Sequence, residues 1–228
     1  MSARCRRGEG EDISIARRVS SQIKAPLTDQ STAEAKAETP GAIILARHGE
    51  PGLSRKIRFD AEGYRRWWAQ YEEVGLREGQ TPPLALAAMA EKAGVIIAST
   101  RRRSVETAHA VAAGRAYSQD PLFIEAPLPP PRWPSWIKLS PRMWGFFARF
   151  WWWFFDHHEG QETRAQAQAR ANEAAGMVAE LAENGQDVLV VAHGFFNTMI
   201  GEALKRRGWR CIQDQGFRYW SARIFRRC

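Results

Sequence analysis

The sequence has few cysteines and no apolar run long enough to cross a membrane. The three cysteines, Cys5, Cys211 and Cys228, are scattered over 228 residues. This number and spacing exclude a disulfide framework and a zinc site built from clustered cysteines. Sparse cysteines are typical of proteins in a reducing compartment, and we therefore expect a cytoplasmic location.

Residues 1–40 lack the features of common targeting segments. They contain no continuous apolar core of the kind that a secretory signal peptide needs, and their seven basic and six acidic residues do not fit an acid-poor transit peptide. Residues 19–39 are rich in Ala, Ser, Gln, Glu and Lys and contain few large apolar side chains, a composition that disfavours folding. We interpret residues 1–40 as a flexible N-terminal extension and residues 41–228 as the folded domain.

Acidic residues are fewer than basic ones, but the imbalance is local. The chain has 33 Lys and Arg against 25 Asp and Glu, which gives a net charge of +8. Residues 205–228 contain eight basic residues and one acidic residue, so this segment alone carries +7. The remainder is nearly neutral, which argues against a nucleic-acid-binding surface along the whole chain. We expect no nucleic-acid partner.

Short apolar runs alternate with helical patterns through the rest of the chain. Three runs, at residues 42–46, 95–98 and 187–192, have the length and composition of buried strands, and residues 217–225 have the β-propensity of a final strand. Helices are predicted at residues 61–76, 84–93, 99–113, 141–155 and 161–184, and over about a dozen residues from Phe195. Buried strands that alternate with helices predict an α/β fold with a mainly parallel sheet covered on both faces.

Polar residues follow three of these strands. Arg47 and His48 come after the first strand, Arg103 lies four residues after Ser99 at the end of the second, and His193 follows the last. Because ligands of open α/β sheets bind at the carboxyl ends of the strands, we expect these side chains to converge on one crevice.

Such a crevice suits phosphoryl transfer. Arginine offers planar, bidentate donors for phosphoryl oxygens at any working pH. A neutral imidazole is a good nucleophile at pH 7, and nearby arginines help to keep it unprotonated. Helices that begin after Ser99 and Gly194 would add backbone N–H donors. Together these groups can stabilise a transferring phosphoryl group without a metal ion.

The same residues resemble a known family. Residues 45–50 (LARHGE) are similar to the signature of the histidine phosphatase superfamily, the phosphoglycerate mutase-like proteins. The spacing within residues 99–108 matches the second motif of that family, and residues 190–194 (VVAHG) match the third. The motifs occur in family order and cover roughly residues 42–205, which makes the match far more specific than one motif alone.

The resemblance implies a fold and a set of roles. It implies a three-layer α/β/α sandwich, transient phosphorylation of His48, a phosphate pocket completed by Arg47, Arg103 and His193, and no cofactor or metal. It also implies an acidic proton donor after the second motif, for which residues 122–125 supply Glu125. Residues 126–129 (APLP) depart from the Gly-Trp-Glu-Gly-like segment of many members, so Glu50 and Glu162 stay as alternatives.

Three functions remain open at this point. We favour a phosphatase that acts on a small phosphomonoester, because residues 51–54 (PGLS) stand where the mutases of the family have an Asn-rich continuation and because their long Tyr- and Lys-bearing insert is absent. The first alternative is phosphoglycerate mutase-type transfer. The second is a non-catalytic protein that binds a phosphorylated ligand or a lipid surface.

The most unusual segment is rich in proline and aromatic residues. We interpret residues 127–155 as an insertion that begins with a proline-rich stretch, in which regular helix and central strand are excluded. Residues 133–155 hold six of the ten tryptophans and five of the eleven phenylalanines. As a helix, residues 143–155 would be only about 20 Å long, too short to span a bilayer. The segment could form core and pocket wall, a lid, or a dimer or membrane-surface patch. As a pocket wall it would suit an aromatic or isoprenoid-like leaving group.

Overall fold

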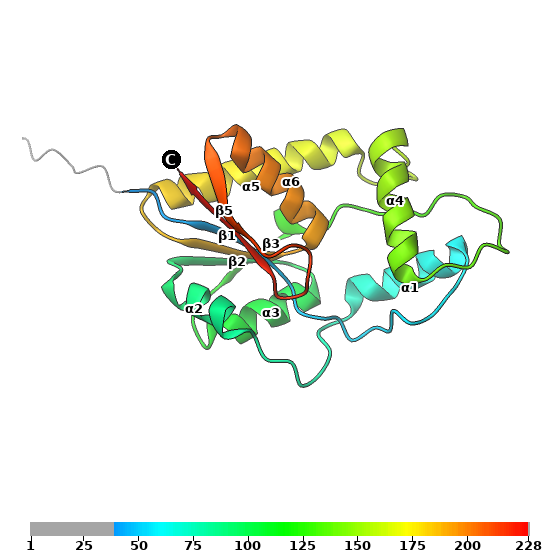
Figure 1. Cartoon of the computed structure of the whole chain (residues 1–228), viewed down its shortest axis with the longest axis horizontal. Coiled ribbons are helices and arrows are strands. Elements are labelled where there is room, and N and C mark those ends of the chain that lie inside the picture. Colours follow the sequence, from blue (N-terminus) through cyan, green and yellow to red (C-terminus); the bar gives the residue numbers. More distant parts are fainter. Residues whose placement is uncertain (1–38, 228) are drawn as a thin grey trace, which may run out of the picture. The chain divides into compact units, whose positions relative to one another are not determined.

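The computed structural model describes residues 39–227, which lie in one compact unit (Figure 1). The predicted flexible extension over residues 1–40 falls, except for its last two residues, outside the described part. Within that part, no helix combines the length and the apolar character needed to cross a bilayer.

A six-stranded sheet forms the centre of the domain, in the strand order β3-β2-β4-β1-β6-β5. The first four neighbours in this order pair in parallel, whereas β6 is antiparallel to both β1 and β5. The bounds are β1 Ile43–Arg47, β2 Val95–Ser99, β3 Ser118–Asp120, β4 Val188–Ala192, β5 Trp209–Asp214 and β6 Ala222–Arg227. The parallel arrangement brings the carboxyl ends of β1, β2 and β4 to one edge, as the sequence predicted.

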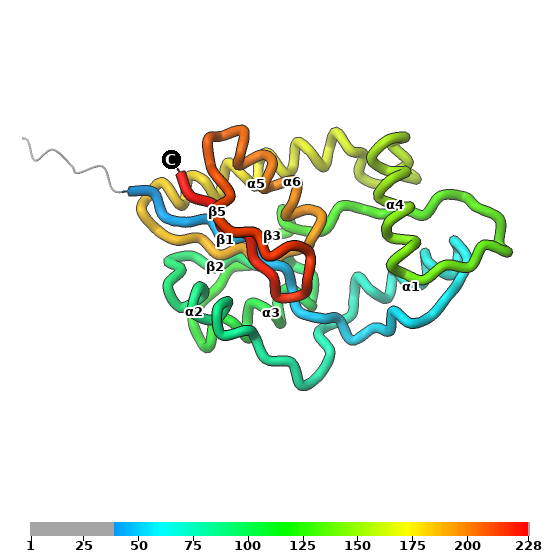
Figure 2. The backbone as a smooth tube through the Cα atoms, in the orientation of Figure 1, coloured from blue at the N-terminus to red at the C-terminus, as the bar shows by residue number. Residues whose placement is uncertain are grey.

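Six α-helices and one short 3-10 helix complete the described fold. They are α1 Ala61–Glu73, α2 Leu84–Lys92, α3 Arg102–Ala112, η1 Pro121–Phe123, α4 Pro141–Phe155, α5 Arg164–Glu183 and α6 Gly194–Arg206. All six α-helices were predicted from the sequence, with ends that differ by three residues or fewer. Figures 1 and 2 show α2 and α3 on one face of the sheet and α5 and α6 on the other. The predicted three-layer α/β/α architecture is therefore confirmed.

The alternation of side chains along β4 explains the two covered faces. Val188, Val190 and Ala192 belong to the core under α5 and α6, whereas Leu189 and Val191 belong to the core under α2 and α3. All five are fully buried. A strand buried on both faces must be apolar at every position, which is why β4 is the most apolar strand run of the sequence.

Helices α1 and α4 build a third, aromatic core beside the sheet (Figure 1). Tyr64 and Trp67 of α1 pack with Trp144 and Ala148 of α4, and the Tyr64 ring is stacked on Trp144 at 6.0 Å between centroids. The Ser140 side chain accepts a hydrogen bond from a backbone N–H at the start of α4, which fixes where this helix begins. Trp152 of the same helix belongs to the core under α5, so the aromatic segment forms core with α1 and also, as expected, with α5.

One local prediction was wrong and one strand was missed. The expected strand at residues 217–225 starts only at β6, because residues 217–221 form the connection from β5, where Trp220 adopts a positive φ of 62°. Strand β5 itself was not predicted. Residues 122–125, which supply the candidate Glu125, follow β3 through η1. Pro121 at the first position of η1 favours this helical turn over a strand.

Candidate active site

The loop after β1 is held against the start of α3. The Gly49 N–H donates to Thr107 Oγ1 at 2.9 Å, and that hydroxyl donates to the Arg103 carbonyl oxygen at 2.6 Å. A Cβ at position 49 would lie 2.4 Å from the Trp220 ring, so only glycine fits there. Hydrogen bonds thus join the first sequence motif to the second.

His48 presents one ring nitrogen to the site. Its Nδ1–H donates to the Gly49 carbonyl oxygen at 2.7 Å. Because a neutral imidazole carries a single ring proton, Nε2 then has a free lone pair. The Arg103 Nε–H donates to this Nε2 at 3.3 Å. His48 is therefore oriented with its unprotonated nitrogen toward the predicted phosphate-binding arginine.

Arg103 is a fully buried cation with several acceptors. Its guanidinium donates to the Tyr71 carbonyl oxygen at 2.7 Å and to Glu72 Oε1 at 3.0 Å, and it lies 4.5 Å from the centroid of the Tyr71 ring. These partners come from the end of α1. A buried guanidinium needs such compensation, so α1 is what fixes the orientation of Arg103.

His193 lies opposite His48, with 5.3 Å between the ring centroids. Its Nε2 is 2.9 Å from Ser99 Oγ, and its Nδ1 is 3.4 Å from Arg103 Nη2. Since arginine only donates, Nδ1 faces Arg103 as the acceptor, which places the proton on Nε2, where it is donated to Ser99. The ends of β1, β2 and β4 thus bring both histidines and Arg103 together.

Burial and positive charge keep both imidazoles neutral. Burial and the charges of Arg103 and Arg47 hold the pKa of His48 well below its usual value of 6.5. Burial, Arg103 and the neighbouring His48 lower the pKa of His193 in the same direction. Both rings are therefore uncharged at neutral pH, as a nucleophilic imidazole must be.

These lowered pKa values predict an acid-sensitive fold. Below pH 6.5 the unfolded chain protonates these histidines while the folded chain does not, so the free energy of unfolding should fall as the pH decreases from about 7 to 5. Denaturant unfolding across this range would measure the decline. The His193→Asn variant should show a shallower decline, and variant His109→Ala, on the exposed side of α3, should match the wild type. Stability that is constant or rises toward pH 5 would contradict the assignment.

Arg47 at the end of β1 and Tyr219 of the β5–β6 connection cover the site. The Arg47 guanidinium donates to the Phe217 carbonyl oxygen and lies 4.4 Å from the centroid of the Tyr219 ring. The Tyr219 hydroxyl accepts from Arg55 at 2.7 Å, and its ring is 5.7 Å from that of His48. Only 2% of His48 is exposed. Tyr219 was not among the predicted site residues, because residues 217–225 were expected to form a strand.

Of the three candidate carboxylates, Glu125 is the one that lies in the cavity with Arg47. Its Oε1 accepts from the Phe196 N–H at 2.8 Å and its Oε2 from the Phe195 N–H at 3.4 Å, so it caps the start of α6. Glu50 instead pairs with Arg77 at 2.9 Å and Glu162 with Arg170 at 2.7 Å, and neither lines that cavity.

Arg170 links Glu162 to the segment that carries Glu125. Its guanidinium makes two hydrogen bonds of 2.7 Å to the Glu162 carboxylate and donates to the carbonyl oxygens of Leu122 and Ile124 at 2.9 and 2.8 Å. The alternative acid Glu162 is therefore part of the scaffold that positions Glu125.

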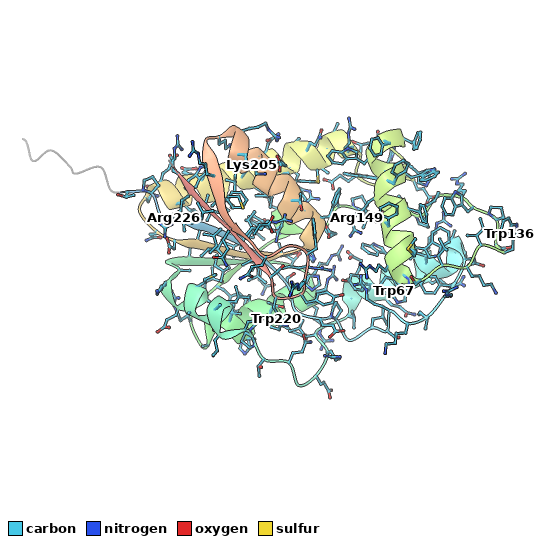
Figure 3. The ribbon with its side chains drawn as sticks, in the orientation of Figure 1. Trp67, Trp136, Arg149, Lys205, Trp220 and Arg226 are labelled. Carbon is cyan, nitrogen blue, oxygen red and sulfur yellow. The ribbon has the colours of Figure 1, made fainter. Side chains whose placement is uncertain are left out.

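The cavity beside these groups has a volume of about 650 Å³ and joins arginine with aromatic side chains. Arg149 of α4 contributes a cation that lies 5.6 Å from the centroid of the Phe195 ring of α6, and Figure 3 shows Arg149 on the side of α4 that faces α6. Trp67 and Phe146 add apolar wall. The aromatic segment thus lines the cavity that contains Arg47 and Glu125.

Comparison with known proteins identifies the class. The sequence profile of the histidine phosphatase superfamily (branch 1) matches residues 43–217. The match includes all three motifs and most of the chain. This chain belongs to the histidine phosphatase superfamily, a group of phosphatase- and mutase-type phosphoryl-transfer enzymes.

Solved structures resemble this chain to different degrees. Bacillus stearothermophilus YhfR shares 23% identity, with a TM-score of 0.53 over 81% of this chain and 90% of that one. The ecdysone phosphate phosphatase of Bombyx mori, solved with tungstate, shares 16% identity with a TM-score of 0.48 over 81% and 88% of the two chains. Mycobacterium tuberculosis Rv3214 shares 20% identity with a TM-score of 0.46 over 81% and 90%. No protein with curated annotation matches the sequence significantly.

Proposed function

We propose that this chain is a metal-independent phosphatase that hydrolyses a small phosphomonoester through a phosphohistidine at His48. The observation that carries the proposal is the orientation of His48. Its Nδ1–H is bound to the Gly49 carbonyl, so the lone pair of Nε2 points to Arg103. A neutral nucleophile beside a cationic phosphate site is the arrangement that covalent phosphoryl transfer requires.

The proposed reaction has two displacement steps. In the first, the Nε2 lone pair of His48 attacks phosphorus, the P–O ester bond breaks, and the departing oxygen takes a proton from Glu125. In the second, Glu125 accepts a proton from water as the water oxygen attacks phosphorus, the P–N bond breaks, and inorganic phosphate leaves. One carboxyl group therefore acts first as acid and then as base.

We propose that Arg47 and Arg103 bind the phosphoryl oxygens directly, and that His193 joins them when its Nε2–H turns from Ser99 Oγ to the substrate. Arg47 Nε is buried and has no hydrogen-bond partner among the described residues, so this donor is available to an oxyanion. The Arg103 Nε–H donates to His48 Nε2 at 3.3 Å, a long hydrogen bond. As the P–N bond forms, the same N–H can donate to a phosphoryl oxygen instead. Hydrogen-bond donors that other contacts already hold in place stabilise the charge of the transition state more than mobile donors do, because they need little reorganisation.

The cavity supports an apolar leaving group. Beside Arg47 and Glu125 it is lined by aromatic side chains from α1, α4 and α6. Aromatic walls favour the burial of rings or branched hydrocarbon. We propose that the leaving group is aromatic or isoprenoid-like, and that catalytic efficiency increases with the apolar area of the ester.

Turnover of an aryl phosphate with EDTA present tests the chemistry. We expect phosphate release that EDTA leaves unchanged and a phosphorylated protein whose label is acid-labile and base-stable, as phosphohistidine is. Label incorporation at an acid-stable site, or activity that EDTA removes, would contradict the mechanism. If labelled phosphoglycerate instead exchanged its phosphate between positions without net release, the chain would be a mutase.

A further inference from the structure

The outward side of α4 carries a stripe of exposed apolar side chains, which we call the α4 stripe. Its members are Met143, Phe146, Phe150 and Phe154, with exposed fractions of 42%, 59%, 40% and 65%. Spacings of three and four residues place them on one side of the helix. The opposite side, which includes Trp144, Ala148 and Trp152, is buried within the chain. A helix that is apolar on all sides is normally covered on all sides.

Unpaired basic residues lie at the N-terminal end of this stripe. Backbone hydrogen bonds of 3.1 and 3.0 Å join Phe59 to Leu139, just before α4, so Arg58 and Lys138 each adjoin this pair and Lys56 is two residues before Arg58. The surrounding cations, all exposed, are Lys56, Arg58, Lys138 and Arg142. Within residues 39–227, none of these four forms an ion pair.

The nearby acidic side chains have other partners. Asp60 accepts a hydrogen bond from the Gly63 N–H at the start of α1. Glu62 pairs with Arg65 and Arg66 of the same helix. The surface around the stripe therefore keeps a positive charge.

From this juxtaposition we infer that the α4 stripe docks on an anionic lipid bilayer, with the four cations at the level of the headgroups. Aromatic side chains on one side of a helix and Lys and Arg beside it are the combination that holds a helix in the membrane interface. A second copy of the chain fits less well. A parallel symmetric contact through the stripe would place the same cations of both copies near each other.

Docking through the α4 stripe would also place the cavity next to the membrane. Phe146 belongs to the stripe and lines the cavity that contains Arg47 and Glu125, and Arg142 does likewise from among the cations. The cavity would then open at the edge of the membrane contact, where an amphiphilic phosphomonoester has its headgroup.

Vesicle co-sedimentation of the full chain tests this inference. We expect the wild type to bind phosphatidylcholine vesicles containing about one-third phosphatidylglycerol about tenfold more strongly than phosphatidylcholine alone. The double variant Phe150→Ser/Phe154→Ser should lose about tenfold or more of this binding, since two exposed rings that would enter the bilayer are removed. The charge variant Lys56→Glu/Arg58→Glu should lose about tenfold and become insensitive to salt.

Matched controls lie away from the stripe. Variant Ile212→Ser removes an exposed apolar side chain of β5. Variant Arg226→Glu reverses an exposed charge of β6, on the opposite side of the molecule from α4 (Figure 3). Both should bind as the wild type does. All variants should retain the wild-type melting temperature and turnover of a soluble aryl phosphate.

Three outcomes would overturn the inference. The first is a wild-type chain that stays in the supernatant with anionic vesicles at both low and physiological salt. The second is equal binding by Phe150→Ser/Phe154→Ser. The third is a wild-type dimer that this variant converts to monomers while no form binds vesicles, which would make a second copy the occupant. None of these readouts depends on the proposed phosphatase activity.

Discussion

Replacement of His48 by alanine is expected to lower kcat by at least about 10⁴-fold and to abolish labelling of the protein by phosphate. The reason is that the variant has no nucleophile at the point where the site can accept a phosphoryl group. His193 cannot replace it, because its Nε2 is bound to Ser99 and its Nδ1 faces Arg103. Single-turnover phosphate release and stoichiometric labelling would measure the two losses.

The control for this variant is His109→Ala, which removes an exposed imidazole from α3. It should retain wild-type turnover and labelling. A melting curve of His48→Ala would show that the fold is intact, since the lost ring is small and its main partner is the backbone of Gly49. Turnover within tenfold of the wild type in a folded His48→Ala protein would show that the nucleophile lies elsewhere.

The second large effect is expected from Glu125→Gln. Loss of a positioned general acid lowers rates by about 10²–10⁴-fold when the leaving group is poor. An alkyl phosphate should therefore lose most of its turnover. An aryl phosphate with a good leaving group needs little protonation, so the first step should survive, and the variant should give a burst of phenol followed by slow release of phosphate.

The glutamine also keeps one oxygen that can accept from the Phe196 N–H, so the shorter of the two hydrogen bonds that cap α6 is preserved. Glu50→Gln is the matched control, because that carboxylate pairs with Arg77 outside the cavity. It should behave as the wild type with both esters. If Glu50→Gln gave the burst and Glu125→Gln did not, the proton donor would be Glu50.

The strands and the convergence of their polar residues could be predicted because they depend on local sequence. Strand β4 is apolar at every position, and in a parallel sheet its carboxyl end must lie at the same edge as that of β1. His48, Arg103 and His193 therefore come together in the structure as expected. Glu125 could be selected from the family motif, but its contact with the start of α6 joins segments 70 residues apart and leaves no local sequence signal.

Features that depend on distant segments could not be predicted. Glu72 balances the charge of Arg103 only because α1 packs beside α3, and nothing in the sequence distinguishes it from other glutamates of α1. Tyr219 reaches His48 because the β5–β6 connection turns back over the site, whereas its residues have ordinary strand propensities. In α4, the start was predictable from Ser140 and Pro141, but a helix apolar all round does not show which side faces the cavity.

The place of β1 in the sheet has a consequence for synthesis on the ribosome. β1 pairs with β4 on one edge and with β6 on the other, and Arg47 contacts the backbone of Phe217, 170 residues later. At translation rates of about 5–20 residues per second, the apolar β1 waits roughly ten seconds or longer for its neighbours. During that time it is a target for chaperones and for aggregation, and the phosphoryl-transfer site stays incomplete until β6 has emerged.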